Sequence, residues 1–212
     1  MTVQTAVDEY AQALRAGQKE YKELLAAGRP THPAVLDELL PENGAETVVD
    51  VGLVEIPSER IVGTKSAGRI AAFTPTFQPL LEAKSEFGSK WINLCAAHLG
   101  DTGITDPIVC YEYLGNFYVQ EGNKRVSVLR HFGAPRIPAT VTRVLPKNDG
   151  SPRVKAYFEF LDFFKATGIY NVQFQRPGDY SKLLSALGKD PDDVWSERER
   201  LNFNAYFSYF AK

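Results

Sequence analysis

Cysteine and methionine are scarce in this chain, and neither sign of charge predominates. Among 212 residues there are two cysteines and one methionine, and the formal net charge is -2. Cys95 and Cys110 match neither a disulfide framework nor the spacing of a zinc site, so we expect both to be small core residues. The near balance of charge argues against a protein that binds nucleic acid over its whole surface, but it allows a local basic pocket.

Long apolar runs are also missing. No stretch approaches the length that a membrane-spanning helix needs, and the first residues lack the apolar core of a secretory signal. These absences predict a cytoplasmic location and no membrane partner. The hydrophobic share of 44% and the charged share of 24% are typical of a chain that buries a core.

The order of sequence patterns predicts an α+β protein with three regions. Residues 1–45 are expected to form a helical N-terminal extension, with helices over 3–27 and 33–40. Residues 46–146 alternate strand-like and helical segments and form the predicted central domain. Residues 147–212 are expected to form a helical, aromatic-rich C-terminal extension, and Ser196 and Glu199 predict a capping box at the start of its last helix.

Within the central region, β-branched runs between turn residues predict strands. The predicted strands cover residues 48–56, 107–114, 117–120 and 137–145. We expect the middle two to form a hairpin around Gly115-Asn116. Bulky residues on one side of 86–99 predict an amphipathic helix.

The most informative segment joins a strand to a helix at Gly122. The strand-like residues 117–119 precede it, and apolar residues recur at helical spacing after it. Lys124 and Arg125 then lie in the first helical turn, where cations oppose the helix dipole. Because a glycine permits close approach and the first-turn N–H groups are free, this pattern predicts a phosphate-binding turn. The alternative is an ordinary strand-to-helix turn with solvated basic residues.

A second group of candidate anion ligands lies in residues 61–69, which we expect to form a loop. Its hydroxyl and basic side chains are Thr64, Lys65, Ser66 and Arg69. The segment is not a Walker A sequence, because Gly-Lys-Ser/Thr does not occur at the required spacing. It can still offer N–H, hydroxyl and guanidinium groups to a phosphate. The alternative is a flexible surface turn.

Taken in order, these residues resemble a known superfamily. The segments that carry the resemblance are Gly52-Leu-Val-Glu-Ile-Pro57, Gly68-Arg69, Thr105-Asp-Pro-Ile108, Gly115-Asn-Phe-Tyr-Val119, Glu121-Gly-Asn-Lys-Arg125 and Gly133-Ala-Pro-Arg-Ile-Pro138. Over residues 50–145 the chain resembles the ParB N-terminal/sulfiredoxin-like superfamily, in particular a bacterial ParB-like group. The resemblance implies a small mixed sheet with helices and a pocket for a nucleotide, ATP or CTP.

The resemblance also implies roles for single residues. The turn that grips the phosphates corresponds to Gly122, Asn123, Lys124 and Arg125, and the arginine of the earlier loop corresponds to Arg69. Asn123 departs from the superfamily, because ParB proteins usually carry a glutamate there and sulfiredoxin carries its catalytic cysteine. This departure argues against sulfinic-acid repair.

Glu121 is the candidate catalytic residue. It stands where related serine kinases place a carboxylate, which implies a role as a base or as a ligand of Mg²⁺ bound with the nucleotide. The alternative is that Glu121 only pairs with Lys124 or Arg125.

Three classes of function follow from the resemblance. The first is a nucleotide-binding domain, whose enzymatic form is a phosphotransferase or nucleotide hydrolase. The second is a regulatory or interaction module with a vestigial pocket, whose aromatic residues 203–210 contact another copy or a further domain of a longer protein. The third is association with DNA through the basic residues between 130 and 155. No helix-turn-helix with a basic recognition helix follows the central region, which argues against a role in chromosome partitioning.

Overall fold

The computed structural model describes residues 3–40, 47–101 and 103–210, the last three of these by their backbone alone. The chain divides into two units, Met1–Leu145 and Pro146–Lys212. The structure is α+β, with one mixed sheet and helices in the first unit and helices in the second. None of the helices in the described ranges combines the length and apolar character that crossing a membrane requires.

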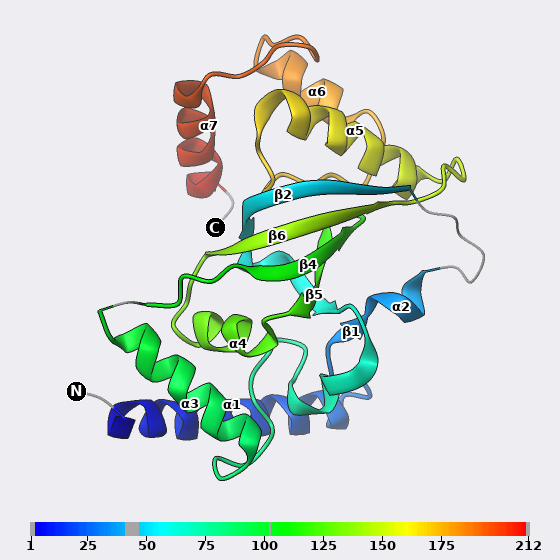
Figure 1. Ribbon diagram of the computed structural model, residues 1–212. Helices are drawn as coiled ribbons and strands as arrows, with labels where there is room; N and C mark the ends of the chain where they lie inside the picture. Colours follow the sequence, from blue (N-terminus) through cyan, green and yellow to red (C-terminus); the bar gives the residue numbers. More distant parts are fainter. Residues whose placement is uncertain (1–2, 41–46, 102, 211–212) are drawn as a thin grey trace. The chain divides into compact units, whose positions relative to one another are not determined.

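Six strands form the sheet of the first unit, in the order β1-β3-β5-β4-β6-β2 (Figure 1). Their bounds are β1 Ala34–Val35, β2 Thr47–Pro57, β3 Ile61–Thr64, β4 Ile108–Tyr113, β5 Asn116–Glu121 and β6 Arg136–Leu145. The pairs β4–β5 and β2–β6 are antiparallel, and the pairs β1–β3, β3–β5 and β4–β6 are parallel. The sheet is therefore mixed, and its central strands β5 and β4 lead into and out of the segments that form the site.

Three helices build the core beside the sheet: α1 (Val3–Ala26), α3 (Glu86–Leu99) and α4 (Asn123–His131). Helix α1 packs on α3, and α3 packs on α4. Tyr10, Trp91 and Val128 are fully buried where the three helices meet, and the Trp91 Nε1–H donates to Ser127 Oγ at 2.8 Å. The N-terminal helix therefore contributes to the core of the first unit. The predicted boundary between residues 45 and 46 lies outside the described ranges.

Both cysteines are buried and unpaired, as the sequence predicts. Burial raises the pKa of Cys95 to about 11 and that of Cys110 to about 12. Thiols with pKa values this high are almost entirely protonated at neutral pH, so they are poor nucleophiles and poor metal ligands.

Residues 33–40 and 61–64 differ from their predicted secondary structure because they contain strands that pair with each other. The segment 33–40 contains the short strand β1 and the helical turn α2 (Leu36–Leu39), because Ala34 and Val35 pair with Gly63 and Thr64 of β3. Residues 61–64, predicted as part of a loop, form β3 itself. A Cβ on Gly63 would collide with the Ala34 carbonyl, so the glycine is what lets β1 pair with β3.

The β4–β5 hairpin turns one residue earlier than predicted. Leu114 and Gly115 form the turn, with φ values of 51° and 80°, and Asn116 already pairs with Tyr113 as the first residue of β5. Positive φ at both central residues is typical of tight hairpin turns. The Gly115 N–H donates to Oε1 of the buried Glu112 at 2.7 Å, which holds the turn in place.

The second unit contains α5 (Pro152–Thr167), α6 (Asp179–Ala186) and α7 (Glu197–Phe210). Its core is aromatic, and its largest buried side chains include Tyr157, Phe160, Phe163, Tyr180 and Trp195. The predicted capping box at the start of α7 is confirmed. The Ser196 N–H donates to Glu199 Oε2 at 2.8 Å, and the Glu199 N–H donates to Ser196 Oγ at 3.4 Å.

The passage from β5 into α4 depends on Gly122. Its φ of 105° is a left-handed backbone conformation that favours glycine. A Cβ on this residue would also lie 2.7 Å from Ile108 Cγ2, at the start of β4. The chain therefore leaves the sheet and begins the helix at this point with the least strain when residue 122 carries no side chain.

We expect Gly122→Ala to lower the free energy of unfolding by about 2–5 kcal/mol. The left-handed conformation costs a side chain about 1–2 kcal/mol, and overpacking against Ile108 costs about 1–3 kcal/mol more. The control is Gly133→Ala at the other end of α4, where φ is 71° but no atom lies within 4 Å of the added Cβ. Urea unfolding measures both. Equal losses in the two variants would contradict the contact with Ile108.

Candidate functional site: an anion-binding pocket at the start of α4

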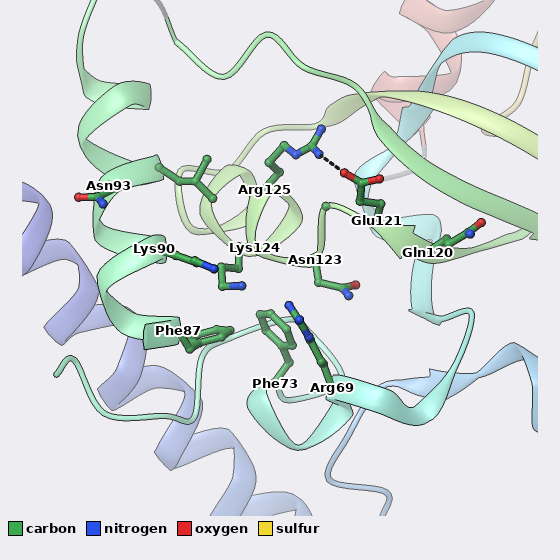
Figure 2. A pocket seen from close by; sticks show the side chains of 12 residues that line it. Arg69, Phe73, Phe87, Lys90, Asn93, Gln120, Glu121, Asn123, Lys124 and Arg125 are labelled. Carbon is green, nitrogen blue, oxygen red and sulfur yellow. Dashed lines mark hydrogen bonds and ion pairs between the residues drawn. The ribbon is translucent and has the colours of Figure 1, made fainter. Parts of the chain in front are cut away.

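A pocket of about 470 Å³ lies at the beginning of α4 (Figure 2). Its walls come from four parts of the first unit. The 3₁₀ turn η2 (Ala67–Ala72) supplies Arg69, and the following segment supplies Phe73. Helix α3 supplies Phe87 and Lys90. The end of β5 and the first turn of α4 supply Glu121, Gly122, Asn123, Lys124 and Arg125.

The first turn of α4 leaves backbone donors open at this wall. The first helical hydrogen bond runs from the Val126 N–H to the Gly122 carbonyl, at 3.0 Å. The N–H groups of Asn123, Lys124 and Arg125 meet no acceptor among the described residues. Free N–H groups together with the positive end of the helix dipole attract anions.

Three cations from three different elements converge on the pocket. In Figure 2 the side chains of Arg69, Lys90 and Lys124 point toward the same space. Burial lowers the pKa of Lys124, and the charges of Arg69 and Lys90 lower it further. Burial is the largest cause, and among the nearby charges Arg69 and Lys90 together outweigh the opposite effect of Glu86.

Carboxylates balance only part of this charge. Glu86 pairs with Lys90 at 2.6 Å on the exposed side of α3, and nearby cations, chiefly Lys90, lower its pKa. Within the described ranges neither Arg69 nor Lys124 forms an ion pair. Lys124 instead places its Nζ 5.1 Å from the centre of the Phe87 ring. Two of the three cations are therefore available to an anionic ligand.

Arg125 is placed differently from its neighbour Lys124. Its guanidinium donates to the carbonyls of Asp106, at 3.1 Å, and Pro107, and it lies 3.5 Å from Glu121 Oε1. The dashed line in Figure 2 marks this last contact. In this structure Arg125 therefore joins the start of α4 to the start of β4, and Glu121 is its partner, as one alternative interpretation of the sequence predicts.

The other predicted anion ligands do not line the pocket. Thr64 lies in β3, is 3% exposed and donates its hydroxyl to the Ser66 carbonyl at 2.9 Å. Lys65 forms an ion pair with Asp37 and lies 5.2 Å from the centre of the Tyr111 ring. Because residues 61–64 are a strand and not a loop, the structure brings only Arg69 of this group to the pocket.

Sequence reasoning missed Lys90 and the aromatic wall. Phe73 and Phe87 meet edge to face with ring centres 5.1 Å apart, on one side of the pocket. Lys90 lies on the exposed side of an amphipathic helix, where a lysine is ordinarily solvated. Only the packing of α3 on α4 shows that Phe87 and Lys90 face the turn at Gly122. The period of α3 marks its buried side but does not show which segment it packs against.

No group of three or more histidine, cysteine, aspartate or glutamate side chains that could hold a metal ion occurs in the described part of the chain. The pocket does contain one oxygen atom without a partner. Asn123 Oδ1 is buried and accepts no hydrogen bond from any described residue. A buried carbonyl oxygen of this kind costs free energy unless a donor or a cation reaches it.

We expect Arg125→Met to lower the free energy of unfolding by about 1.5–3 kcal/mol, because hydrogen bonds from a charged group are lost at a side chain that is 17% exposed. Lys90→Met is the matched control. Its side chain is 60% exposed, so we expect a change within about 0.5 kcal/mol. Urea unfolding checks both values. A loss at Arg125 no larger than that at Lys90 would contradict the positioning role.

Comparison with known proteins leaves the function of this pocket open. No protein-family model matches the chain, and no curated protein matches it. The resemblance to the ParB/sulfiredoxin-like superfamily therefore depends on the residues quoted above and stays a prediction.

Proposed function

We propose that the first unit binds a nucleotide, ATP or CTP, with its phosphates in the pocket at the start of α4. The observation that carries the proposal is the convergence of Arg69, Lys90 and Lys124 on one hollow in which Arg69 and Lys124 have no ion-pair partner among the described residues. Like charges repel, so this arrangement costs stability in the free protein. A bound polyphosphate removes that cost.

The energies and dimensions are adequate for such a ligand. A hydrogen bond between a charged donor and a phosphate contributes about 1.5–3 kcal/mol before desolvation. Three or four such bonds support micromolar affinity, which corresponds to about 8 kcal/mol. The volume of about 470 Å³ lies in the range of small-molecule pockets, roughly 300–1,000 Å³. Phe87, which is only partly buried, adds aromatic surface to the pocket.

As part of this proposal we assign the first unit to the ParB/sulfiredoxin-like fold. The order of its elements supports the assignment: strand β2, the arginine of η2, helix α3, the β4–β5 pair, the turn at Gly122 with helix α4, and strand β6. Of the superfamily's phosphate-gripping residues, Arg69 and the turn from Gly122 to Arg125 all line the pocket. Nucleotide binding in the cytoplasm is the role that this assignment favours.

An enzymatic form of the proposal uses Glu121. Its carboxylate lines the pocket and is 73% exposed, and its one ion pair among the described residues is the 3.5 Å contact with Arg125. Mg²⁺ bound with nucleotides commonly takes one or two protein oxygen ligands and the phosphates. Glu121 and the unpartnered Asn123 Oδ1 supply oxygen atoms of this kind. The ion would screen the phosphate charges, and Glu121 would bind it or accept the proton of the attacking group.

Two of the basic residues between 130 and 155, Arg130 and Arg143, are engaged within the protein. Arg130 donates to the carbonyls of Ser58 and Ile61 and packs on Phe77, 5.3 Å from the ring centre. Arg143 is paired with the buried Glu112. Because these guanidinium groups are used inside the protein, the nucleotide pocket is the better-supported site.

We expect Lys124→Ala to weaken the affinity for Mg·ATP or Mg·CTP at least tenfold, because it removes the unpaired cation closest to the helix start. Isothermal titration calorimetry measures this. The control is Lys84→Ala, an exposed lysine that does not line the pocket, which should stay within about twofold of wild type, since remote surface charges contribute little.

A thermal-shift screen with ATP, CTP and GTP identifies the base. At a hundredfold excess over Kd the ligand should stabilise the protein by about 2.7 kcal/mol. If no nucleotide shifts the melting temperature, or if Lys84→Ala and Lys124→Ala lose affinity equally, the nucleotide proposal is wrong and a vestigial pocket remains.

Turnover separates the enzyme from a binding domain. We expect Glu121→Gln to abolish release of phosphate or nucleoside diphosphate while leaving nucleotide affinity within about threefold, since the amide keeps the shape but cannot accept a proton. Chromatography of the nucleotide products with ATP and with CTP measures the rate. Equal turnover in both proteins would dismiss the role of the carboxylate.

A further inference from the structure

A second hollow, of about 460 Å³, lies within the C-terminal unit. It runs between the end of α6 and the exposed length of α7. Its apolar walls are formed chiefly by Phe174, Leu183, Leu187, Trp195, Phe203 and Phe207. All the residues that line this hollow belong to the second unit, so it is independent of the nucleotide pocket.

The aromatic wall of this hollow is held in position by the start of α7. Trp195 is 4% exposed, and its backbone N–H donates to the Ala166 carbonyl at the end of α5, at 3.0 Å. Its ring meets Phe203 edge to face at 5.5 Å, and Phe203 stacks on Phe207 at 5.9 Å with 13° between the ring planes. The three rings form a preformed surface that a flat apolar group can contact without rearrangement.

The charges at the margin of the hollow cancel one another. Lys189, which follows α6, forms an ion pair with Glu199 of α7. Hydrogen bonds from Lys189 and Ser196 lower the pKa of Glu199 to about 2, and the bond to Glu199 raises the pKa of Lys189. Both groups therefore stay charged and paired across the physiological range. The margin presents no net charge to a ligand, in contrast to the pocket of the first unit.

Exposed side chains keep the hollow accessible. Leu187 is 44% exposed and Tyr206 is 70% exposed, although both line it. Apolar groups that remain in water at the mouth of a hollow stabilise a complex when a ligand covers them. The lining set is smaller than the roughly 20–30 residues that each side of a standard protein interface contributes. Its volume instead matches a small-molecule pocket, about 300–1,000 Å³.

We propose that the hollow between α6 and α7 binds an uncharged, mostly apolar small molecule that carries a planar ring. The ring packs against Trp195, Phe203 and Phe207, and the rest of the molecule covers Leu183 and Leu187. The paired Lys189 and Glu199 leave no unmatched charge that would select an ionic ligand.

Nile red tests the proposal, since it is uncharged, planar and fluoresces strongly in apolar surroundings. We expect saturable binding of one molecule to the full chain. Leu187→Asp and Tyr206→Asp place a carboxylate in the wall at two separate exposed positions, and each should raise the Kd at least tenfold. Leu201→Asp is the matched control, because Leu201 is 63% exposed on α7 but does not line the hollow, and its Kd should stay within twofold of wild type.

Three outcomes would overturn the proposal. The first is the absence of saturable binding to the wild type. The second is an equal loss in Leu187→Asp and Leu201→Asp, which would indicate a general surface effect. The third is a wild-type dimer in light scattering that becomes monomeric in Leu187→Asp or Tyr206→Asp, which would assign the hollow to a second copy of the chain. Circular dichroism of each variant verifies that the second unit remains folded.

Discussion

The left-handed backbone of Gly122, pressed against Ile108, is the constraint on which the candidate site depends. It lets the chain turn sharply at the end of β5, so that α4 begins beside Ile108, the first residue of β4. The turn leaves the first N–H groups of α4 open and sends Lys124 toward the pocket. Arg125, one residue later, reaches back to the Asp106 and Pro107 carbonyls and secures the same turn. The adjacent residues Lys124 and Arg125 therefore have different roles: Lys124 faces the pocket, and Arg125 secures the turn.

Among the described residues, some cations have hydrogen-bond or ion-pair partners and others have none. This contrast is the strongest indication of function. Arg130 is half-buried and forms no ion pair with any described residue, but backbone carbonyls and the Phe77 ring surround its guanidinium. Arg143 has the carboxylate of Glu112. Lys124 lies over the Phe87 ring but has neither a carbonyl nor a carboxylate partner among the described residues, and it shares its surroundings with Arg69 and Lys90. Groups with perturbed pKa values that lie in a cleft are found more often at functional sites than elsewhere. Arg69 is exposed, so solvent and salt reduce its share of the effect.

Local patterns predicted most of the secondary structure. The periodicity of α1 and α3, the β-branched run of β2 and the capping box of α7 all depend on residues within a turn or two of one another. The predicted helix start after Gly122 has the same origin. The predictions that differ from the structure have a different cause, which is how the strands pair. The short β1 exists only because Ala34 and Val35 pair with β3, and the β4–β5 turn is centred on Leu114-Gly115 with the support of buried Glu112.

The candidate site follows the same division. Residues 121–125 and Arg69 could be identified from the sequence because their order and spacing carry the resemblance, and all of them line the pocket. Lys90, Phe73 and Phe87 could not, because an exposed lysine or a phenylalanine on a helix carries no mark of the element it will face. Amino-acid order alone determined where α4 begins and that cations and a glycine occur there, since those are properties of adjacent residues. Tertiary packing decided which cations lie close together, as where α3 packs on α4. It also decided which cations already donate hydrogen bonds to backbone carbonyl groups. Both kinds of contact join residues many positions apart in the sequence.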